Sequence, residues 1–492
     1  MKRLLMGAGA ALALGAPGLA HAEAACAELA NATLPHAEVI SATVEKVGTG
    51  EACRIAVASH PTPDSNIKLE VWIPLGAAWN GKFVQLGNGG FAGTVLTGQL
   101  RGVAARGYAA ASTDDGHQTP VGTNASWALG HPEKLVDFGW RALKETTDIS
   151  KSLIAAQKGL KPRTSYFSGC SDGGREALME AQRFPNDFDG IVAGAPANAM
   201  SQLFGISAAQ HQALSAPGGY LGQVELSLLQ KSVLAQCADG GAFVRDPAAC
   251  HFDPGKLQCK AGATEGCLTG PQVHSARVMY EGRRDPRTGK IGFPGFTPGA
   301  EALPNSWATW VVGANEAQHS RAAGYQFSSN AFKYFAFGDP SFDFLKMDLG
   351  AQFDQARRKM GPIIDSDSPN LAAFKKHGGK LIQYHGWNDP AIPARSSILY
   401  YEDVSKTMGD TSGFYRLYLV PGMLHCGGGA SPTNVDWLGQ LDAWVSEKKA
   451  PAAVTAAAAP NGSGATQLLC PYPGVARKTG EAWSCAAPKH RS

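Results

Sequence analysis

The stretch Arg163–Pro185 reads "RTSYFSGCSDGGREALMEAQRFP" and carries the clearest fold signal of the chain. A short apolar run is followed by Gly-Cys-Ser-Asp-Gly and then by a segment with helical character. G-x-S-x-G between a strand and a helix is typical of a nucleophile elbow, in which a serine lies on a sharp, strained turn. A tight structural turn is the alternative. The motif predicts Ser171 as a nucleophile and leaves Cys170, directly before it, to be explained.

Segments on both sides of this motif alternate between strand and helix patterns. A helix is expected over residues 140–157, where one side stays largely apolar. Strands are expected within residues 66–75, 81–93, 107–117, 163–170, 188–197, 378–390 and 414–429. Such alternation indicates an α/β fold with a parallel sheet.

The alternation is interrupted over residues 198–345. This part contains four cysteines, many aromatic residues and turn signals such as Arg283–Lys290. We therefore expect one α/β domain made of residues 23–197 and 346–492, with residues 198–345 inserted as a cap. Two side-by-side domains are the alternative, but they would leave the last two strands without a sheet.

The N-terminus has the order of a secretory signal peptide. Lys2 and Arg3 precede an apolar run, Leu4–Leu14, and Ala20-His21-Ala22 offers a small-residue cleavage site. The alternative is a membrane anchor, but the run is shorter than the ~20 residues needed to span a bilayer. Residues 1–22 are thus predicted to be removed, and the protein to be secreted or periplasmic.

Charge and hydropathy give no reason to expect a macromolecular partner. The formal net charge is +3, and the sequence contains no dense run of Lys and Arg. We therefore predict no nucleic-acid partner. Beyond the N-terminal run no segment is long and apolar enough to span a membrane, so we predict no membrane partner either and expect a small-molecule substrate.

Ten cysteines in an oxidising compartment predict five disulfides. Sequence alone fixes no pairing, but short loops favour Cys26–Cys53, Cys237–Cys250, Cys259–Cys267 and Cys470–Cys485. If these pairs form, Cys170 and Cys426 are left for each other. A zinc site is the rival interpretation, and it is weakened because no Cys-x-x-Cys pair occurs.

A serine nucleophile needs a base, and in α/β-hydrolases the partners follow in the order Ser, acid, His. Asp389 in "YHGWNDP" and His425 in "PGMLHCGGG" each follow a predicted strand. We therefore expect His425 to be the general base and Asp389 to orient it. A disulfide between Cys170 and Cys426 would attach the base loop to the elbow, whereas a reactive thiol at Cys170 is the alternative.

Three other residues compete for these roles. His385 lies within a predicted strand and is expected to be a buried structural histidine. His117 precedes the serine in the chain and is expected to shape the site. Asp436 lies on a late helix and is expected to face solvent.

An oxyanion site requires two backbone N–H donors. One should belong to Asp172, directly after the nucleophile. The other should come from the glycine-rich loop Gly87–Gly90, where small residues permit close approach.

These motifs together resemble the tannase and feruloyl esterase family of secreted α/β-hydrolases. The resemblance covers nearly the whole mature chain, through "WNGKFVQLGNGGFAG", "GCSDGGREALMEAQRFPNDFDGIVAGAPA", "YHGWNDPAIP", "LVPGMLHCGGG" and "LCPYP". It implies a triad of Ser171, Asp389 and His425 bridged by a Cys170–Cys426 disulfide. It also implies oxyanion donors at Gly90 and Asp172, and it makes residues 198–345 a lid in which Trp310 packs on an aromatic acyl group.

One segment departs from the family pattern. Family lids carry an aspartate-rich calcium loop after a cysteine, whereas "CADGGAFVRDPAAC" (residues 237–250) retains only Asp239 and Asp246. Two carboxylates are few for an ion that takes about six to eight oxygens. Calcium is therefore expected to be lost or weakly bound, and ester cleavage needs no cofactor.

The resulting prediction is a secreted serine carboxylesterase that acts on hydroxycinnamoyl esters of the feruloyl type. Galloyl esters are the second choice. Mono(2-hydroxyethyl) terephthalate is a third, and it would need an arginine in the lid, for which Arg321 is the candidate. A peptidase and a non-catalytic ligand-binding protein on the same fold are the alternatives from other classes.

Overall fold

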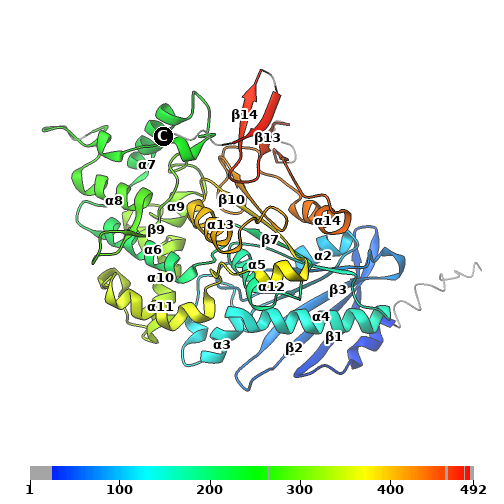
Figure 1. Ribbon diagram of the computed structural model, residues 1–492. Helices are drawn as coiled ribbons and strands as arrows, with labels where there is room; N and C mark the ends of the chain where they lie inside the picture. The colour runs from blue at the N-terminus through cyan, green and yellow to red at the C-terminus, as the bar shows by residue number, and fades with distance from the viewer. Residues whose placement is uncertain (1–24, 264, 460–463, 481, 488–492) are drawn as a thin grey trace, which may run out of the picture.

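A mixed nine-stranded β-sheet forms the centre of the molecule (Figure 1). The computed structural model describes residues 25–263, 265–459, 464–480 and 482–487, so the predicted signal peptide, residues 1–22, lies outside the described residues. The strand order is β1-β2-β3-β5-β4-β6-β7-β10-β11. Strands from β5 to β11 pair in parallel, whereas β1, β2 and β3 form an antiparallel edge. The predicted α/β fold with a parallel sheet is confirmed, and the antiparallel strands extend it.

The nine strands differ in length, and those in the middle are short. Their bounds are β1 (Ala37–Val47), β2 (Gly50–Ser59), β3 (Ile67–Pro74), β4 (Lys82–Leu86), β5 (Ala109–Thr113), β6 (Thr164–Cys170), β7 (Gly190–Gly194), β10 (Lys380–Gly386) and β11 (Tyr415–Val420).

Both faces of the sheet are buried against helices. Side chains alternate along each strand, so Phe83 and Ile191 belong to one core and Val84 and Val192 to the other. The first core is closed by α4 (Ala142–Lys158), α5 (Asp172–Arg183), α12 (Ala372–His377) and α13 (Ala394–Met408). The second is closed by α2 (Thr97–Ala105) and α14 (Trp437–Glu447). Burial on two faces explains why these strands are short apolar runs in the sequence.

The chain between β7 and β10 leaves the sheet and forms a mainly helical region with an apolar core of its own. We use "inserted segment" for residues 198–345. Its elements are α6 (Met200–Ser215), α7 (Gln223–Cys237), α8 (Gly270–Glu281), α9 (Trp307–Trp310), α10 (Ala323–Asn330), η8 (Ala331–Phe337) and the hairpin of β8 (Gly282–Arg284) with β9 (Ile291–Pro294). Figure 1 shows these elements gathered on one side of the molecule, away from β1 and β2. The helical packing continues past residue 345, because α11 (Ala351–Ile364) contacts α6 and η8.

All ten cysteines are paired in five disulfides. Four are the local pairs that the short loops favoured, Cys26–Cys53, Cys237–Cys250, Cys259–Cys267 and Cys470–Cys485. The fifth joins Cys170 to Cys426 across a sequence separation of 256 residues. Disulfides persist in oxidising environments, which agrees with an extracytoplasmic protein.

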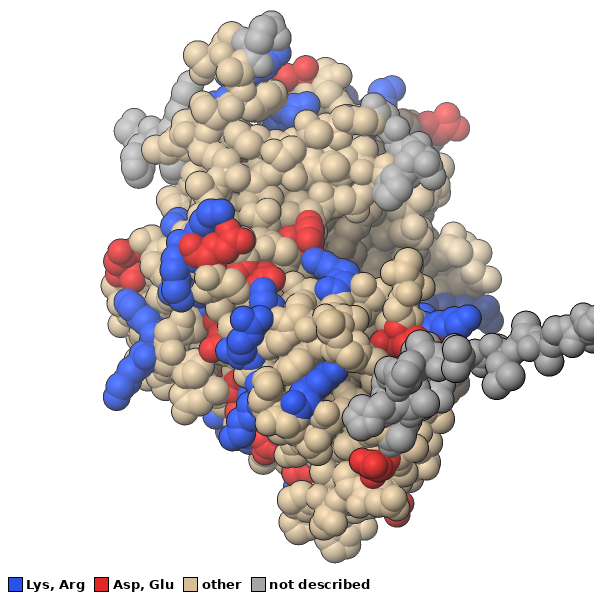
Figure 2. Space-filling model, turned by 90° about the vertical axis from the view of Figure 1, so that its right-hand side faces the viewer, with Lys and Arg blue, Asp and Glu red and all other residues tan. Residues whose placement is uncertain are grey.

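The C-terminal part adds two small hairpins, β12 (Val454–Ala457) with β13 (Thr466–Leu469) and β14 (Val475–Thr479) with β15 (Ala482–Ala486). Within the described part of the chain, no helix has the length and apolar character that crossing a membrane would require. On the face shown in Figure 2, basic and acidic side chains intermingle and a broad area carries few charges of either sign.

Candidate active site

Ser171 lies on the sharp turn between β6 and α5, in a backbone conformation that residues other than glycine rarely adopt. Its φ is 66° and its ψ is −120°, and such strain is typical of functional sites. The glycines of the motif are required by close approach. A Cβ at Gly169 would lie 2.4 Å from the carbonyl oxygen of Gly173, and one at Gly173 would lie 2.7 Å from that of Asn88. The turn is therefore a nucleophile elbow in geometry as well as in sequence.

Ser171, His425 and Asp389 form one hydrogen-bonded chain, although they come from three separate loops. The Ser171 hydroxyl donates to Nε2 of His425 at 2.8 Å. Nδ1–H of His425 donates to Oδ2 of Asp389 at 2.7 Å. The sequence-predicted residues are thus brought together in the order nucleophile, base, orienting acid that serine hydrolases use.

Asp389 is fully buried and held as an acceptor. The backbone N–H groups of Ala391 and Ile392 donate to its Oδ1 at 2.8 and 2.9 Å. Burial alone would raise the pKa of this carboxyl, but the neighbouring His425 and His385 hold that pKa well below its usual range. Asp389 is therefore an anion beside His425 and can stabilise the imidazolium that forms when His425 takes a proton.

His385 is buried, as expected, but it also contacts the site. Its Nε2–H donates to the carbonyl oxygen of Ile392 at 3.0 Å and lies 3.2 Å from Oδ2 of Asp389. Its Nδ1 is 2.7 Å from the hydroxyl of Ser397. His385 and His425 thus both contact Oδ2 of Asp389. Sequence reasoning missed the His385 contact because nothing in "YHGWNDP" reveals which way the ring points.

The other two competing residues lie apart from the hydrogen-bonded chain. His117 is buried, its Nε2–H donates to the carbonyl oxygen of Phe91 at 2.7 Å, and its ring stacks on Trp127 with centroids 3.8 Å apart. Burial lowers the pKa of His117 to about 4. It therefore holds the residue after Gly90 in place. Asp436 is exposed at the start of α14 and pairs with Arg106 at 2.9 Å.

The Cys170–Cys426 disulfide joins the residue before Ser171 to the residue after His425, with the two Cα atoms 6.0 Å apart. Cys426 has a φ of 60°, so the base loop turns sharply where it is attached. The bridge therefore connects nucleophile and base through a short covalent path.

Gly90 and Asp172, the two candidate oxyanion donors, line the same pocket as Ser171. Gly90 has a φ of 65°, and a Cβ there would lie 2.6 Å from the carbonyl oxygen of Gly122. The loop is tied to the elbow because the N–H of Gly173 donates to the carbonyl oxygen of Asn88 at 2.8 Å. These contacts explain why a glycine-rich loop is needed here.

A mostly apolar pocket opens on Ser171. Its walls come from both parts of the α/β domain and from the inserted segment. It is lined by Gly90, Phe91, Ser171, Asp172, Ala197, Met200, Leu203, Phe204, Ile206, Ser207, Gln210, Phe296, Trp310, Val311, Gly324, Phe327, Ser328, Pro390, Ala391 and Ile392.

Comparison with known proteins places this geometry in a family. Residues 53–490 match the family model described as tannase and feruloyl esterase. The chain belongs to the tannase and feruloyl esterase family. An uncharacterized esterase of Xanthomonas campestris pv. campestris is 35% identical, with 92% of this chain and 88% of the relative covered. The mono(2-hydroxyethyl) terephthalate hydrolase of Piscinibacter sakaiensis is 31% identical, with 95% and 87% covered. The crystal structure of feruloyl esterase B from Aspergillus oryzae superposes with a TM-score of 0.84 at 26% identity, covering 94% of this chain and 100% of that one.

Membership makes the protein a carboxylic ester hydrolase with the α/β-hydrolase fold. In this esterase the inserted segment brings Trp310 to the site, where its ring contacts that of His425 with centroids 4.9 Å apart. The same ring lies nearly parallel to that of Phe327, at an interplanar angle of 11°. Arg321 is exposed and is not among the residues that line the pocket.

The loop at residues 237–250 does not fit a calcium ion. Asp246 faces Arg477, with their charged atoms 3.8 Å apart. Among the described residues of this loop, no three His, Cys, Asp or Glu side chains lie close enough together to hold a metal ion. Calcium takes about six to eight oxygens. We therefore derive no step through a metal at this loop.

Two polar side chains in the pocket were not found from the sequence. Nε2 of Gln210 and Oγ of Ser328 are buried and have no hydrogen-bond partner among the described residues. Both lie on helices of the inserted segment, α6 and α10, where no motif marks them. Only the packing of these helices over Ser171 reveals that the two groups face a ligand site.

Proposed function

We propose that this esterase hydrolyses esters of aromatic acids, with hydroxycinnamoyl esters of the feruloyl type preferred, through an acyl-enzyme on Ser171. The observation that carries the proposal is the pocket, which is apolar and aromatic beside the Ser171 hydroxyl. A flat acyl ring against Trp310 and Phe327, which are partly exposed, would bury apolar area on both.

The polar groups of the pocket favour a lightly substituted ring. Gln210 and Ser328 offer buried partners for one or two ring oxygens, as a hydroxyl and a methoxy group would provide. A galloyl ring carries three hydroxyls and would leave more polar groups to satisfy. Among the described lining residues there is no Lys or Arg, so the free carboxylate of mono(2-hydroxyethyl) terephthalate would have no cationic partner.

The proposed reaction follows from the hydrogen-bonded chain. Ser171 Oγ attacks the ester carbonyl carbon while Nε2 of His425 takes the hydroxyl proton. The carbonyl oxygen becomes an oxyanion that accepts hydrogen bonds from the N–H groups of Gly90 and Asp172. The C–O bond then breaks, His425 gives its proton to the leaving alcohol, and Ser171 retains the acyl group.

Water completes the cycle. His425 takes a proton from a water molecule, the hydroxide attacks the acyl carbon, and the proton passes to Ser171 Oγ as the acid leaves. Throughout, Asp389 holds His425 with Nε2 toward Ser171. The reaction needs no cofactor. The five disulfides and the signal-peptide pattern of residues 1–22 support action outside the cytoplasm, in the periplasm or the medium.

The test is a hydrolysis panel of methyl ferulate, methyl gallate and mono(2-hydroxyethyl) terephthalate, with Ser171→Ala as the matched inactive variant. We expect kcat/KM to be highest for methyl ferulate and the Ala variant to lose at least ~10⁴-fold of kcat. A preference for the terephthalate half-ester or the gallate would overturn the proposed substrate class. Full turnover by Ser171→Ala would overturn the mechanism.

A further inference from the structure

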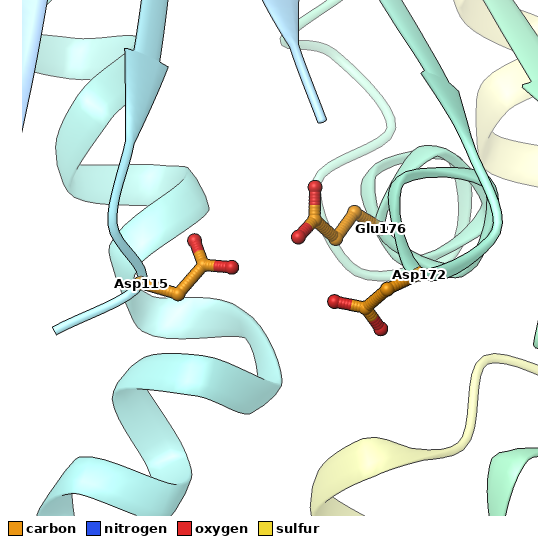
Figure 3. A group of neighbouring side chains, drawn as sticks. All are labelled: Asp115, Asp172 and Glu176. Atoms are coloured by element: carbon orange, nitrogen blue, oxygen red, sulfur yellow. The ribbon is translucent and has the colours of Figure 1, made fainter. Parts of the chain in front are cut away.

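Three buried carboxyl groups lie close together (Figure 3). Two of them, Asp115 and Glu176, bond to Asn88 in the loop that carries Gly90. Asp115 follows β5, and Asp172 and Glu176 lie on α5. Figure 3 shows the side chains of Asp115 and Glu176 pointing toward each other. One oxygen from each of the three groups lies within 4.8 Å of the others, and each residue is at most 1% exposed. None of the three side chains belongs to the Ser171–His425–Asp389 chain.

Among the described residues that bond to these three carboxyl groups, Arg175 is the one cation. Arg175, itself fully buried, donates through both Nε and Nη2 to Asp172. Asp115 and Glu176 are then left facing each other. Two unpaired negative charges in a buried site are strongly unfavourable, so such a site takes up a proton.

The hydrogen bonds show where that proton belongs. Glu176 Oε2 accepts the N–H of Asn88 at 2.9 Å, and Asp115 Oδ2 accepts from the side-chain amide of Asn88 at 3.2 Å. The remaining oxygens, Asp115 Oδ1 and Glu176 Oε1, have no partner among the described residues. One proton held between the two carboxyl groups would reduce the buried charge and supply the missing hydrogen bond.

We propose that Asp115 and Glu176 share one proton at neutral pH, and that this carboxyl–carboxylate pair positions the Gly87–Gly90 loop for oxyanion binding. The pair acts through the loop and touches no substrate, so these are positioning residues. The positioning role rests on the proposed function, because it assigns the oxyanion to Gly90. A metal ion is a poorer occupant, since the Arg175 guanidinium and the Asn88 amide both direct N–H donors into the cluster.

The loop depends on the pair through Asn88, two residues before Gly90. Besides its bond to Glu176, Asn88 accepts from the N–H of Gly173 at 2.8 Å and donates to the carbonyl oxygen of Thr113 at 2.7 Å. Gly87 packs so closely that a Cβ there would lie 2.6 Å from Glu176 Oε2. A shift of Glu176 would therefore move the loop, and with it the N–H of Gly90.

Burial raises the pKa of both carboxyl groups, and repulsion from Asp115 raises that of Glu176 further. A carboxyl whose pKa is higher in the folded than in the unfolded state stabilises the fold at low pH. That contribution is lost as the pH rises through the folded-state pKa. We therefore expect the shared proton to leave on the alkaline side, with loss of kcat and of Tm.

Other titratable groups surround the pair, and the variants must be distinguished from them. On α5 these are Asp172 and Arg175. Near β5, Asp114 accepts from the backbone N–H of Lys68 and Gly116, and burial raises its pKa to about 7. Two further titratable groups near the end of β5 are His117 and the buried Asp137, which lies beside Gly116 and pairs with Arg141. A change at Glu176 alone leaves all of these in place.

The decisive variant is Glu176→Gln. The amide keeps an oxygen for Asn88 and offers a permanent N–H donor toward Asp115, so it mimics the protonated pair. We expect kcat at pH 7 within about twofold of wild type and an alkaline decline in kcat that is reduced or absent. The alkaline decline in Tm should be reduced but not abolished, because Asp114 and Glu180 also have raised pKa values. Glu176→Leu keeps neither contact, and kcat should fall roughly 10- to 100-fold with little change in KM.

Glu180→Gln is the matched control, because Glu180 lies four residues further along α5, is equally buried and also has a raised pKa. Its kcat should follow the wild-type pH profile. The proposal is overturned if Glu176→Gln keeps the wild-type alkaline decline, if it loses as much kcat at pH 7 as Glu176→Leu, or if Glu180→Gln changes the profile equally. The Tm measurements use no substrate. They therefore test the shared proton even if the proposed substrate class is wrong.

Discussion

Two regions of the molecule face the pocket and differ in how they are stabilised. One is the set of loops at the ends of β6, β10 and β11, and the other is the helices of the inserted segment. Ser171, Asp389 and His425 each follow a parallel strand, and a disulfide and buried hydrogen bonds fix them. Trp310 and Ser328 instead lie on short helices that pack around separate apolar clusters.

The two regions differ because the strand loops must hold groups for proton transfer, whereas the inserted segment forms a pocket wall. Proton transfer requires heavy atoms within about 3 Å and correct orientation, so the backbone around each reacting group is constrained. Such constraint produces motifs, including glycines at close approaches and cysteines beside the serine and histidine. A pocket wall needs only suitable shape and a few polar groups, which many sequences can supply.

Among the variants that compare the two regions, the largest effect should come from changing Asp389, the proposed orienting acid of the strand loops. Asp389→Asn keeps the size of the side chain but can favour the wrong tautomer of His425, so kcat should fall by about 10⁴-fold with KM nearly unchanged. The measurement is steady-state kinetics on methyl ferulate. Asp436→Asn, at an exposed position, is the control and should retain wild-type kcat. If Asp389→Asn lowers kcat by less than tenfold, the orientation of His425 does not depend on this hydrogen bond as strongly as we expect.

The disulfides give a second comparison between the two regions. Cys170→Ala/Cys426→Ala removes a disulfide whose cysteines are 256 residues apart in sequence. Cys259→Ala/Cys267→Ala removes one in the inserted segment whose cysteines are 8 residues apart. The chain-entropy relation gives about 5.5 kcal/mol of stability for the first and about 2.5 kcal/mol for the second. Only the first should also lower kcat, because it attaches His425 to the elbow. Denaturant unfolding measures the stability of both double variants, and steady-state kinetics measures their kcat. If both lose kcat equally, the Cys170–Cys426 disulfide has no special role in holding His425 near the elbow.

A smaller effect is expected from the pocket wall. Trp310→Ala should lower kcat/KM for methyl ferulate by roughly tenfold, since an aromatic contact to the acyl ring is lost. Methyl acetate, which has no ring, should lose less than about threefold. Trp483→Ala, on the exposed β14–β15 hairpin, is the control. If both esters lose activity equally, Trp310 acts through His425 or through folding and not through the acyl ring.

Much of the catalytic region could be predicted from the sequence. The strands at β3 through β7, β10 and β11 were expected. Residues 66–75 alternate between apolar and polar side chains, and the others are mainly short apolar runs that end in turns or polar loops. The antiparallel edge formed by β1 and β2 was missed, since "AEVISATVEKV" and "GEACRIAVAS" do not stand out as buried runs. Nearly all residues of β1 and some of those of β2 are at least partly exposed. The contact of His385 with Asp389 was also missed, because it depends on a ring orientation that packing sets.

The sequence by itself determined the α/β fold, the elbow at Ser171, the order of its partners and the presence of an insertion. These follow from local periodicity, from glycines where chains meet, and from cysteines beside the reacting groups. The tertiary structure decided which side chains of the inserted segment reach Ser171. It alone brought Asp115 against Glu176 at Asn88 of the Gly87–Gly90 loop. No local sequence pattern marks the pocket side chains of the inserted segment or the Asp115–Glu176 pair. Both arrangements depend on how elements that are distant in sequence pack together.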